Sequence, residues 1–177
     1  MIERIIMNTI ETLLTRRSCR AYTNQKVESE KLDTILKCGT YAPSGRGLQS
    51  CYIVSIEDEQ TLKTLRKINA EIMGYDGDPF YGAPNMIVVL ADPNIPTYQY
   101  DGPCVLDHMM IAAHDLGLAS CWIHRAKETF ASEIGKQLLK QWGLPEYLVG
   151  IGNLALGYAN GELPQAKARK ANYITKV

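Results

Sequence analysis

The sequence lacks a net charge and lacks any long apolar run. Its 177 residues include 19 Lys and Arg against 19 Asp and Glu. A duplex-binding protein usually presents a long basic face, which this composition does not supply. No stretch approaches the roughly 18 apolar residues of a membrane span, and no signal peptide with a small-residue cleavage site is recognisable. We therefore expect a soluble, cytoplasmic protein that binds neither nucleic acid nor membrane.

The sequence also lacks the spacings of a metal site. Its cysteines form no C-x-x-C pair, which argues against a zinc ribbon, an iron–sulfur site or a disulfide framework; they are Cys19, Cys38, Cys51, Cys104 and Cys121. None of the three histidines, His108, His114 and His124, has a second ligand at i+3 or i+4. We expect no metal site. The cysteines are expected to be buried structural thiols, and His108 and His114 to form hydrogen bonds.

Two nucleotide-binding motifs are excluded by their context. Gly150–Ala155 matches the G-x-G-x-x-A pattern, but that motif works where a strand turns into a helix, and here the continuation is strand-like. A P-loop is excluded because the sequence has no Gly-Lys-Ser or Gly-Lys-Thr triplet. Neither a Rossmann site nor a P-loop is expected.

Hydrophobic periodicity predicts one α+β domain spanning residues 1–177. Helices are expected around Ile6–Leu14, Ser29–Gly39, Asp58–Met73, Cys104–Leu116 and Ser132–Trp142. Strands are expected at Cys51–Ile56, Met86–Ala91, Cys121–Ile123, Tyr147–Leu156 and Asn172–Val177, the last of these unpaired. Met1 and Met7 are alternative start residues. The strands are too few and too widely spaced for a doubly wound parallel sheet.

A cluster of cationic side chains is the most informative feature. Arg16, Arg17 and Arg20 lie within five residues, with the hydroxyl of Ser18 between them, and a second basic pair, Lys167 and Arg169, lies near the other end of the chain. Two short basic clusters suit a terminal phosphate better than a long polyanion. The alternative is a solvated charged surface.

Four segments resemble the nitroreductase family, the dimeric flavoproteins that carry FMN. The segments are "RRSCRAY", "APSGRGLQS", "GLASCWIHRAKE" and "LALGYANGELPQAKARK". They occur in the order and at about the spacing of that family, and the similarity extends from about Glu11 to the end of the chain. The resemblance implies a mostly antiparallel sheet flanked by helices in an intertwined homodimer, with two FMN sites at the interface.

The resemblance also implies roles for individual residues. Those expected to bind the FMN phosphate are Arg16, Arg17, Ser18, Arg20, Lys167 and Arg169. Those expected to reach the flavin of the neighbouring subunit are Pro43, Ser44, Gly45, Gly47 and Gln49. Ile123 and His124 are expected along the ring edge, with a main-chain N–H near flavin N5. Many family members carry Asn where this chain has Gly47, so a side-chain contact to the flavin is either absent here or supplied by Arg46 or Gln49.

The implied activity is transfer of a hydride from NADH or NADPH through flavin N5 to a small-molecule acceptor such as a nitroaromatic or a quinone. No catalytic side chain is expected, because the cofactor supplies the chemistry and the protein supplies position and charge. Two alternatives stay open: another FMN chemistry on the same fold, such as dehalogenation or flavin fragmentation, and an FMN-binding module without turnover.

Overall fold

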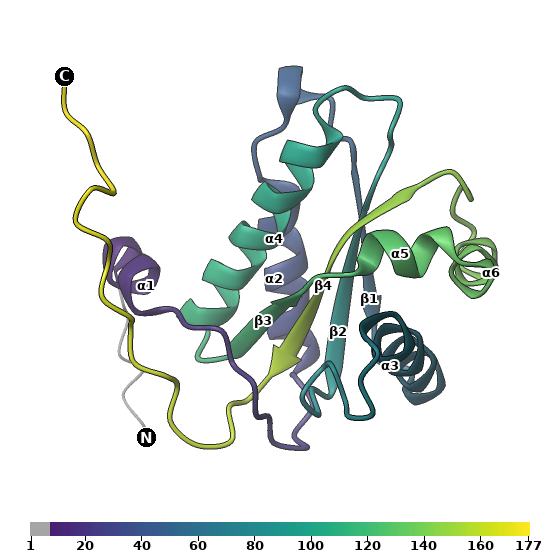
Figure 1. Cartoon of the computed structure of the whole chain (residues 1–177), viewed down its shortest axis with the longest axis horizontal. Helices are drawn as coiled ribbons and strands as arrows, with labels where there is room; N and C mark the ends of the chain where they lie inside the picture. The colour runs from purple at the N-terminus through teal and green to yellow at the C-terminus, as the bar shows by residue number, and fades with distance from the viewer. Residues whose placement is uncertain (1–7) are drawn as a thin grey trace.

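A computed structural model of the chain describes residues 8–177 and contains one four-stranded sheet (Figure 1). The strands lie in the order β1-β2-β4-β3, and every pairing between neighbours is antiparallel. Their bounds are Cys51–Ile56 for β1, Asn85–Ala91 for β2, Ala119–Ile123 for β3 and Val149–Gly157 for β4. This confirms the α+β class. Ile6, predicted to begin a helix, and the alternative starts Met1 and Met7 lie outside the described residues.

Helices cover both faces of the sheet. Figure 1 shows α2 and α4 on one face and α3, α5 and α6 on the other. The helices are α1 Thr9–Thr15, α2 Ser29–Thr40, α3 Glu59–Met73, α4 Tyr98–Asp115, α5 Ala126–Ala131 and α6 Glu133–Gln141, with a 3₁₀ turn at Gly45–Gly47. The antiparallel sheet is therefore flanked by helices, as the resemblance implied.

Strand β2 lies between two hydrophobic cores, one on each face of the sheet, and all seven of its residues are buried. Successive strand residues point to opposite faces. Val88 and Leu90 accordingly pack in the core beneath α3 and α5, whereas Ile87 and Val89 pack in the core beneath α2 and α4. A continuous apolar run is what such a doubly covered strand requires.

The helix predictions were incomplete in two places. Helix α4 begins at Tyr98, six residues before the predicted start at Cys104, although Pro103 lies inside it. The amides of Tyr100 and Asp101 already bond to the carbonyl of Thr97, so the helix is established before the proline is reached. Helix α5 was not predicted; Ser132 ends it and also caps α6 through a bond from the Gly135 amide.

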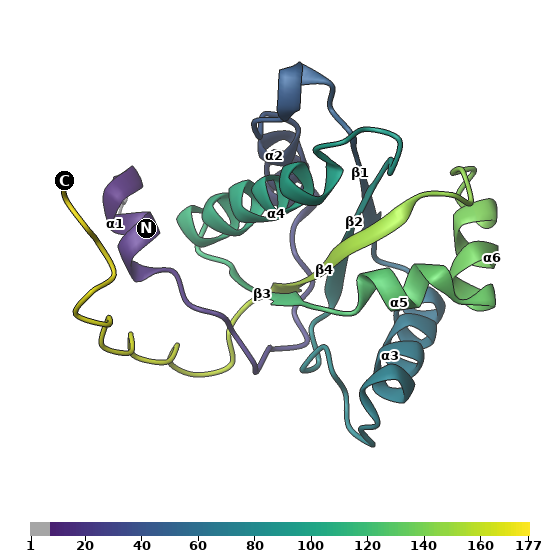
Figure 2. The same ribbon diagram turned by 45° about the horizontal axis from the view of Figure 1, so that its top comes forward.

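The prediction of a strand at Asn172–Val177 is wrong for the single chain. These residues form a turn and an irregular, exposed end. They belong to a C-terminal tail, residues 161–177, which Figures 1 and 2 show leaving the sheet on the side of α1. A strand needs a neighbour to satisfy its N–H and C=O groups, and no strand of the described chain lies beside this segment.

Within residues 8–177, no helix has both the length and the apolar character that crossing a membrane demands.

Candidate functional site

The arginine segment, Arg16–Arg20, is fixed to the free edge of β3. Ser18 forms a parallel bridge with Ser120, and the amide of Cys19 donates to the carbonyl of Ser120 at 3.0 Å. A few residues further on, the Asn160 amide donates to the carbonyl of Ala21 at 2.9 Å. The segment that follows α1 therefore extends the sheet by one irregular strand.

The three arginines are not equivalent. Arg17 Nη1 donates to the carbonyls of Leu14 at 2.8 Å and Arg16 at 2.6 Å, so this guanidinium caps the end of α1. Arg20 is exposed. Arg16 is half-buried, and its Nη1 is a buried donor without a hydrogen-bond partner. Since buried donors are normally paired, this nitrogen fits an anionic group such as phosphate.

The positive charge of this segment reaches two neighbouring side chains. Burial lowers the pKa of His114, and the charges of Arg16 and Arg17 lower it further. Burial raises the pKa of the Cys121 thiol, although Arg20, a bond from Ser18 and Arg16 act in the opposite direction. The arginines thus create a positive potential at the junction of β3 and α4, where a bound anion would be favoured.

His108 and His114 have the hydrogen-bonding roles expected of them. His108 Nδ1 lies 3.0 Å from the carbonyl oxygen of Cys104, and His114 Nε2 lies 2.9 Å from Thr15 Oγ1. Among the residues described, no three His, Cys, Asp or Glu side chains gather as a metal site would require.

The second basic pair is not brought to the first in the single chain. Lys167 and Arg169 are exposed on the C-terminal tail, and neither forms a hydrogen bond or ion pair with any described residue. The start of the tail does lie beside the arginine segment: residues 18–21 and 159–164 line a cavity of about 320 Å³. The first residues of the tail therefore border this cavity, and Lys167 and Arg169 follow further along the tail.

Four of the five predicted loop residues lie in one surface loop, which we call the Ser44–Ser50 loop, and the fifth, Pro43, directly precedes it. Gly47 has a φ of 66°, a conformation that glycine adopts freely. The loop borders a cavity of about 370 Å³ between α2, β1 and α4, lined in part by Ser44 and Gln49. Ser44 Oγ accepts a bond from the Gln49 amide at 3.0 Å.

The loop and the arginine segment lie at opposite edges of the sheet. The loop leads directly into β1, whereas the arginine segment borders β3, and β2 and β4 lie between them. Three strand spacings amount to about 14 Å. One chain therefore does not bring its loop and its arginines into a single compact site.

The end of β3 places the remaining predicted residues. Ile123 is buried in the core, so only its backbone faces a ligand, while His124 follows the strand and is exposed. Arg125 has a φ of 85°, and its Nε is buried without a partner. The arginine segment, which bonds to Ser120, and the backbone of His124 therefore lie along the same edge of the sheet, at β3.

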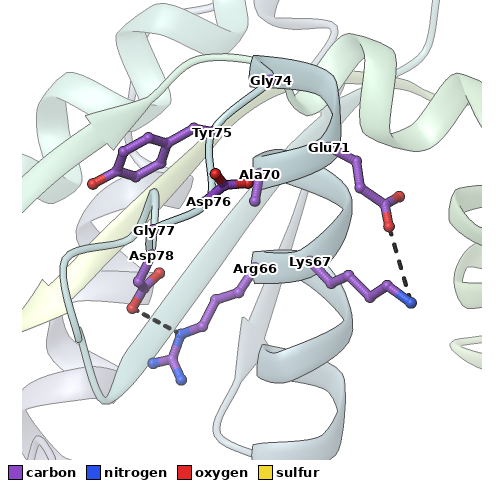
Figure 3. Close-up of a pocket in the computed structure, with 9 residues that line it drawn as sticks. All are labelled: Arg66, Lys67, Ala70, Glu71, Gly74, Tyr75, Asp76, Gly77 and Asp78. Carbon is purple, nitrogen blue, oxygen red and sulfur yellow. Dashed lines mark ion pairs between the residues drawn. The ribbon is translucent and has the colours of Figure 1, made fainter.

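Two polar clusters elsewhere have structural contacts. Figure 3 shows a pocket of about 460 Å³ between the end of α3 and the loop after it, where Asp76, Gly77 and Asp78 lie. Asp78 accepts from the amides of Phe80 and Gly82 and lies 3.4 Å from Arg66 Nε. These contacts hold the loop's own backbone, so the Asp78 carboxylate has a structural role here.

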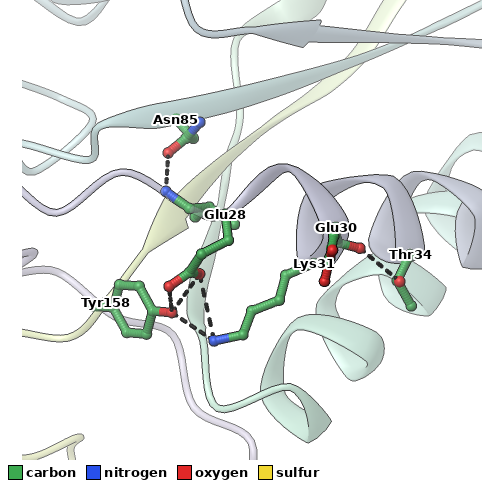
Figure 4. A network of polar contacts seen from close by, with 7 residues as sticks. Glu28, Glu30, Lys31, Thr34, Asn85 and Tyr158 are labelled. Carbon is green, nitrogen blue, oxygen red and sulfur yellow. Dashed lines mark hydrogen bonds and ion pairs between the residues drawn. The ribbon is translucent and has the colours of Figure 1, made fainter.

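The second cluster joins the start of α2 to the end of β4 (Figure 4). Tyr158 donates to the Glu28 carboxylate, and Lys31 Nζ lies 2.6 Å from the Tyr158 hydroxyl. The bond from Tyr158 lowers the pKa of Glu28, with a smaller contribution from Lys31. This network fixes the first turn of α2.

Sequence reasoning missed Asp101, which contacts the Ser44–Ser50 loop at both ends. Its carboxylate accepts from the Gly45 amide at 3.0 Å and from Ser50 Oγ at 2.7 Å. Asp101 lies more than fifty residues after Gly45 and Ser50 in the chain, so no local pattern indicated these contacts.

An antiparallel sheet flanked by helices, with a cationic segment along one edge, defines an α+β protein with a positively charged sheet edge. A model of the nitroreductase family matches residues 13–158, and the chain belongs to that family.

Solved structures support the family assignment. A nitroreductase from Bacteroides fragilis with bound FMN is 30% identical, with a TM-score of 0.88 over 97% of this chain and 99% of that chain. A nitroreductase from Desulfitobacterium hafniense, also with bound FMN, is 27% identical, with a TM-score of 0.86 over the same shares. A relative from Archaeoglobus fulgidus, whose name pairs NADH dehydrogenase with NAD(P)H nitroreductase, is 28% identical over 158 residues, 86% of each chain.

Proposed function

We propose that this protein is an FMN-dependent oxidoreductase that takes electrons from NADH or NADPH and passes them to a small-molecule acceptor, such as a nitroaromatic or a quinone. The observation that supports it most is the orphaned Arg16 Nη1, at the edge of a fold that matches FMN-bound nitroreductases over almost its whole length. Bound FMN would supply the hydride-accepting atom.

The chain's own residues would hold the cofactor. Arg16, Ser18 and Arg20 would bind the phosphate, because charge-assisted hydrogen bonds to phosphate are about twice as strong as neutral ones. Arg17 would act mainly through its charge, since its Nη1 is occupied by carbonyls. The His124 main-chain N–H, at the exposed end of β3, would donate to the ring edge.

A homodimer would complete the site. The Ser44–Ser50 loop and the arginine segment of one chain lie at opposite sheet edges, so a partner's loop would have to approach the arginines of the first chain. The exposed Lys167 and Arg169 could then close over the phosphate. We propose one cytoplasmic domain per chain, with Pro43, Ser44, Gly45, Gly47 and Gln49 facing the partner's cofactor.

The decisive experiment is anaerobic reduction of protein reconstituted with FMN. We expect loss of the oxidised flavin absorbance on addition of NADH or NADPH, and its return when a nitroaromatic or quinone is added. Reconstitution with FAD is the control and should fail, because the proposed site would hold a terminal phosphate. Bound FMN that neither nucleotide reduces would identify a binding module without turnover. Reduction by a nucleotide without reoxidation by these acceptors would point to another FMN chemistry.

A further inference from the structure

Asp101 is a buried carboxylate that joins three separate backbone regions. It lies in the first turn of α4 and is 4% exposed. Its Oδ1 accepts from the Gly45 amide at 3.0 Å, and its Oδ2 accepts from Ser50 Oγ at 2.7 Å and from Thr97 Oγ1 at 3.0 Å. One side chain therefore fixes both ends of the Ser44–Ser50 loop to the start of α4.

The loop between these two ends has an unfavourable backbone. Arg46 has a φ of 55° and Gln49 a φ of 50°, values that residues with a Cβ adopt rarely. Such conformations persist only where surrounding contacts impose them. The loop also packs closely on the start of α4, because a Cβ added to Gly45 would clash with the side chain of Thr97. The contacts of Asp101 are thus placed where the strain has to be held.

The charge of Asp101 is stabilised by hydrogen bonds. Within residues 8–177, no Lys, Arg or His forms an ion pair with it. Burial acts to raise its pKa, but the bonds from Ser50, Gly45 and Thr97 outweigh burial and hold the pKa below its ordinary value. The carboxylate lies near the N-terminus of α4, which also favours a negative charge. Asp101 is therefore ionised at neutral pH.

We propose that Asp101 is a positioning residue that holds the Ser44–Ser50 loop in the conformation required to contact FMN. This inference rests on the proposed function, because the loop faces a cofactor only if that function is correct. Asp101 itself has no part in electron transfer; it acts through Gly45 and Ser50. The cavity of about 370 Å³ that Asp101 and the loop share would keep its shape only while these bonds are made.

The test compares Asp101→Ala, Asp101→Asn and a control, Asp107→Ala, which removes an exposed carboxylate from the same helix. The first measurement is the rate at which trypsin cuts after Arg46 in FMN-free protein. The second is the dissociation constant for FMN from quenching of flavin fluorescence. In Asp101→Ala, both the rate of trypsin cutting and the dissociation constant for FMN should rise at least about tenfold, since bonds to a charged acceptor are lost. Asp101→Asn keeps one acceptor oxygen for the Gly45 amide and offers an NH2 that the Ser50 or Thr97 hydroxyl can accept from, so it should restore most of both.

Several results would overturn the proposal. A folded Asp101→Ala protein with unchanged cutting, or with faster cutting but unchanged FMN affinity, would do so. If Asp101→Ala does not fold, Thr97→Val removes a single donor, and wild-type behaviour of that variant in both measurements would equally reject the proposal. Wild-type protein that binds no FMN would reject the proposed function and this inference together, whereas tight FMN binding by Asp101→Ala would reject this inference alone.

Discussion

The amide of Cys19 donates a 3.0 Å hydrogen bond to the carbonyl of Ser120, and this contact holds the arginine segment against β3. The same geometry keeps Arg16 half-buried, with one guanidinium nitrogen unpaired. A rigid backbone beneath an orphaned donor is preorganised for an anion, because little conformational freedom is lost when the anion binds.

We predict that Arg16→Ala weakens FMN binding by about 10- to 150-fold, the range that corresponds to losing one charge-assisted hydrogen bond. Lys63→Ala removes an exposed cation from α3 and is the matched control. Fluorescence titration measures both constants. Equal affinities for the wild type and Arg16→Ala would mean that this arginine is part of an ordinary charged surface.

The C-terminal tail should hold the homodimer together. Tyr173 and Ile174 are 68% and 78% exposed in the single chain, and β1 is an edge strand that could accept a partner's segment. Deleting residues 171–177 should give monomer or aggregate by light scattering. Lys176→Ala, the control, should leave the mass of the dimer in light scattering unchanged. A truncated protein that stays a stable, FMN-bound dimer would contradict this role.

His124 should act through its backbone alone. Its imidazole is exposed beyond the end of β3, so His124→Ala should keep most NAD(P)H-dependent flavin reduction and its pH profile. His124→Pro removes the N–H donor, worth about 0.5–1.5 kcal/mol, and should shift the flavin midpoint potential. Retained FMN binding is the control for distortion by proline. Loss of reduction in His124→Ala, with flavin still bound, would make the imidazole catalytic.

His114 should make the FMN-free protein less stable in mild acid. Its pKa is lowered in the folded chain by burial, Arg16 and Arg17, so the unfolded chain binds the proton more tightly. Stability is therefore lost as the pH falls below about 6.5, the ordinary histidine value. The urea midpoint of the wild type should drop between pH 8 and pH 5.5 by more than that of His114→Gln. His124→Gln, at an exposed histidine, should behave like the wild type.

Local patterns identified the elements whose two ends are marked in the sequence. The predicted strand at Cys51–Ile56 has the same two ends as β1, and the helix predicted to begin at Ser29 has the same start as α2. Both are flanked by polar or turn residues and have clear apolar periodicity. Helix α5 was missed because six residues give too little periodicity to recognise. Long-range contacts rather than local preference decide such short elements.

Predicting the individual roles of the arginines was harder. Arg16 and Arg17 are adjacent and chemically identical, yet Arg17 caps α1 while Arg16 keeps a free donor. That difference follows from the direction in which the chain leaves α1 and from the bond between Cys19 and Ser120, neither of which the sequence encodes locally. The contacts of Asp101 depend on tertiary structure in the same way.

The complete burial of β2 has a consequence for measuring the protein. Its amides bond to β1 or β4 and are covered by helices on both faces, so hydrogen exchange at Ile87, Val88 and Val89 should require opening of the whole sheet. Ligands that bind only the folded chain raise the free energy of that opening. The exchange rates of these three amides would therefore report the binding energy of any ligand, including ligands that are colourless and are not turned over.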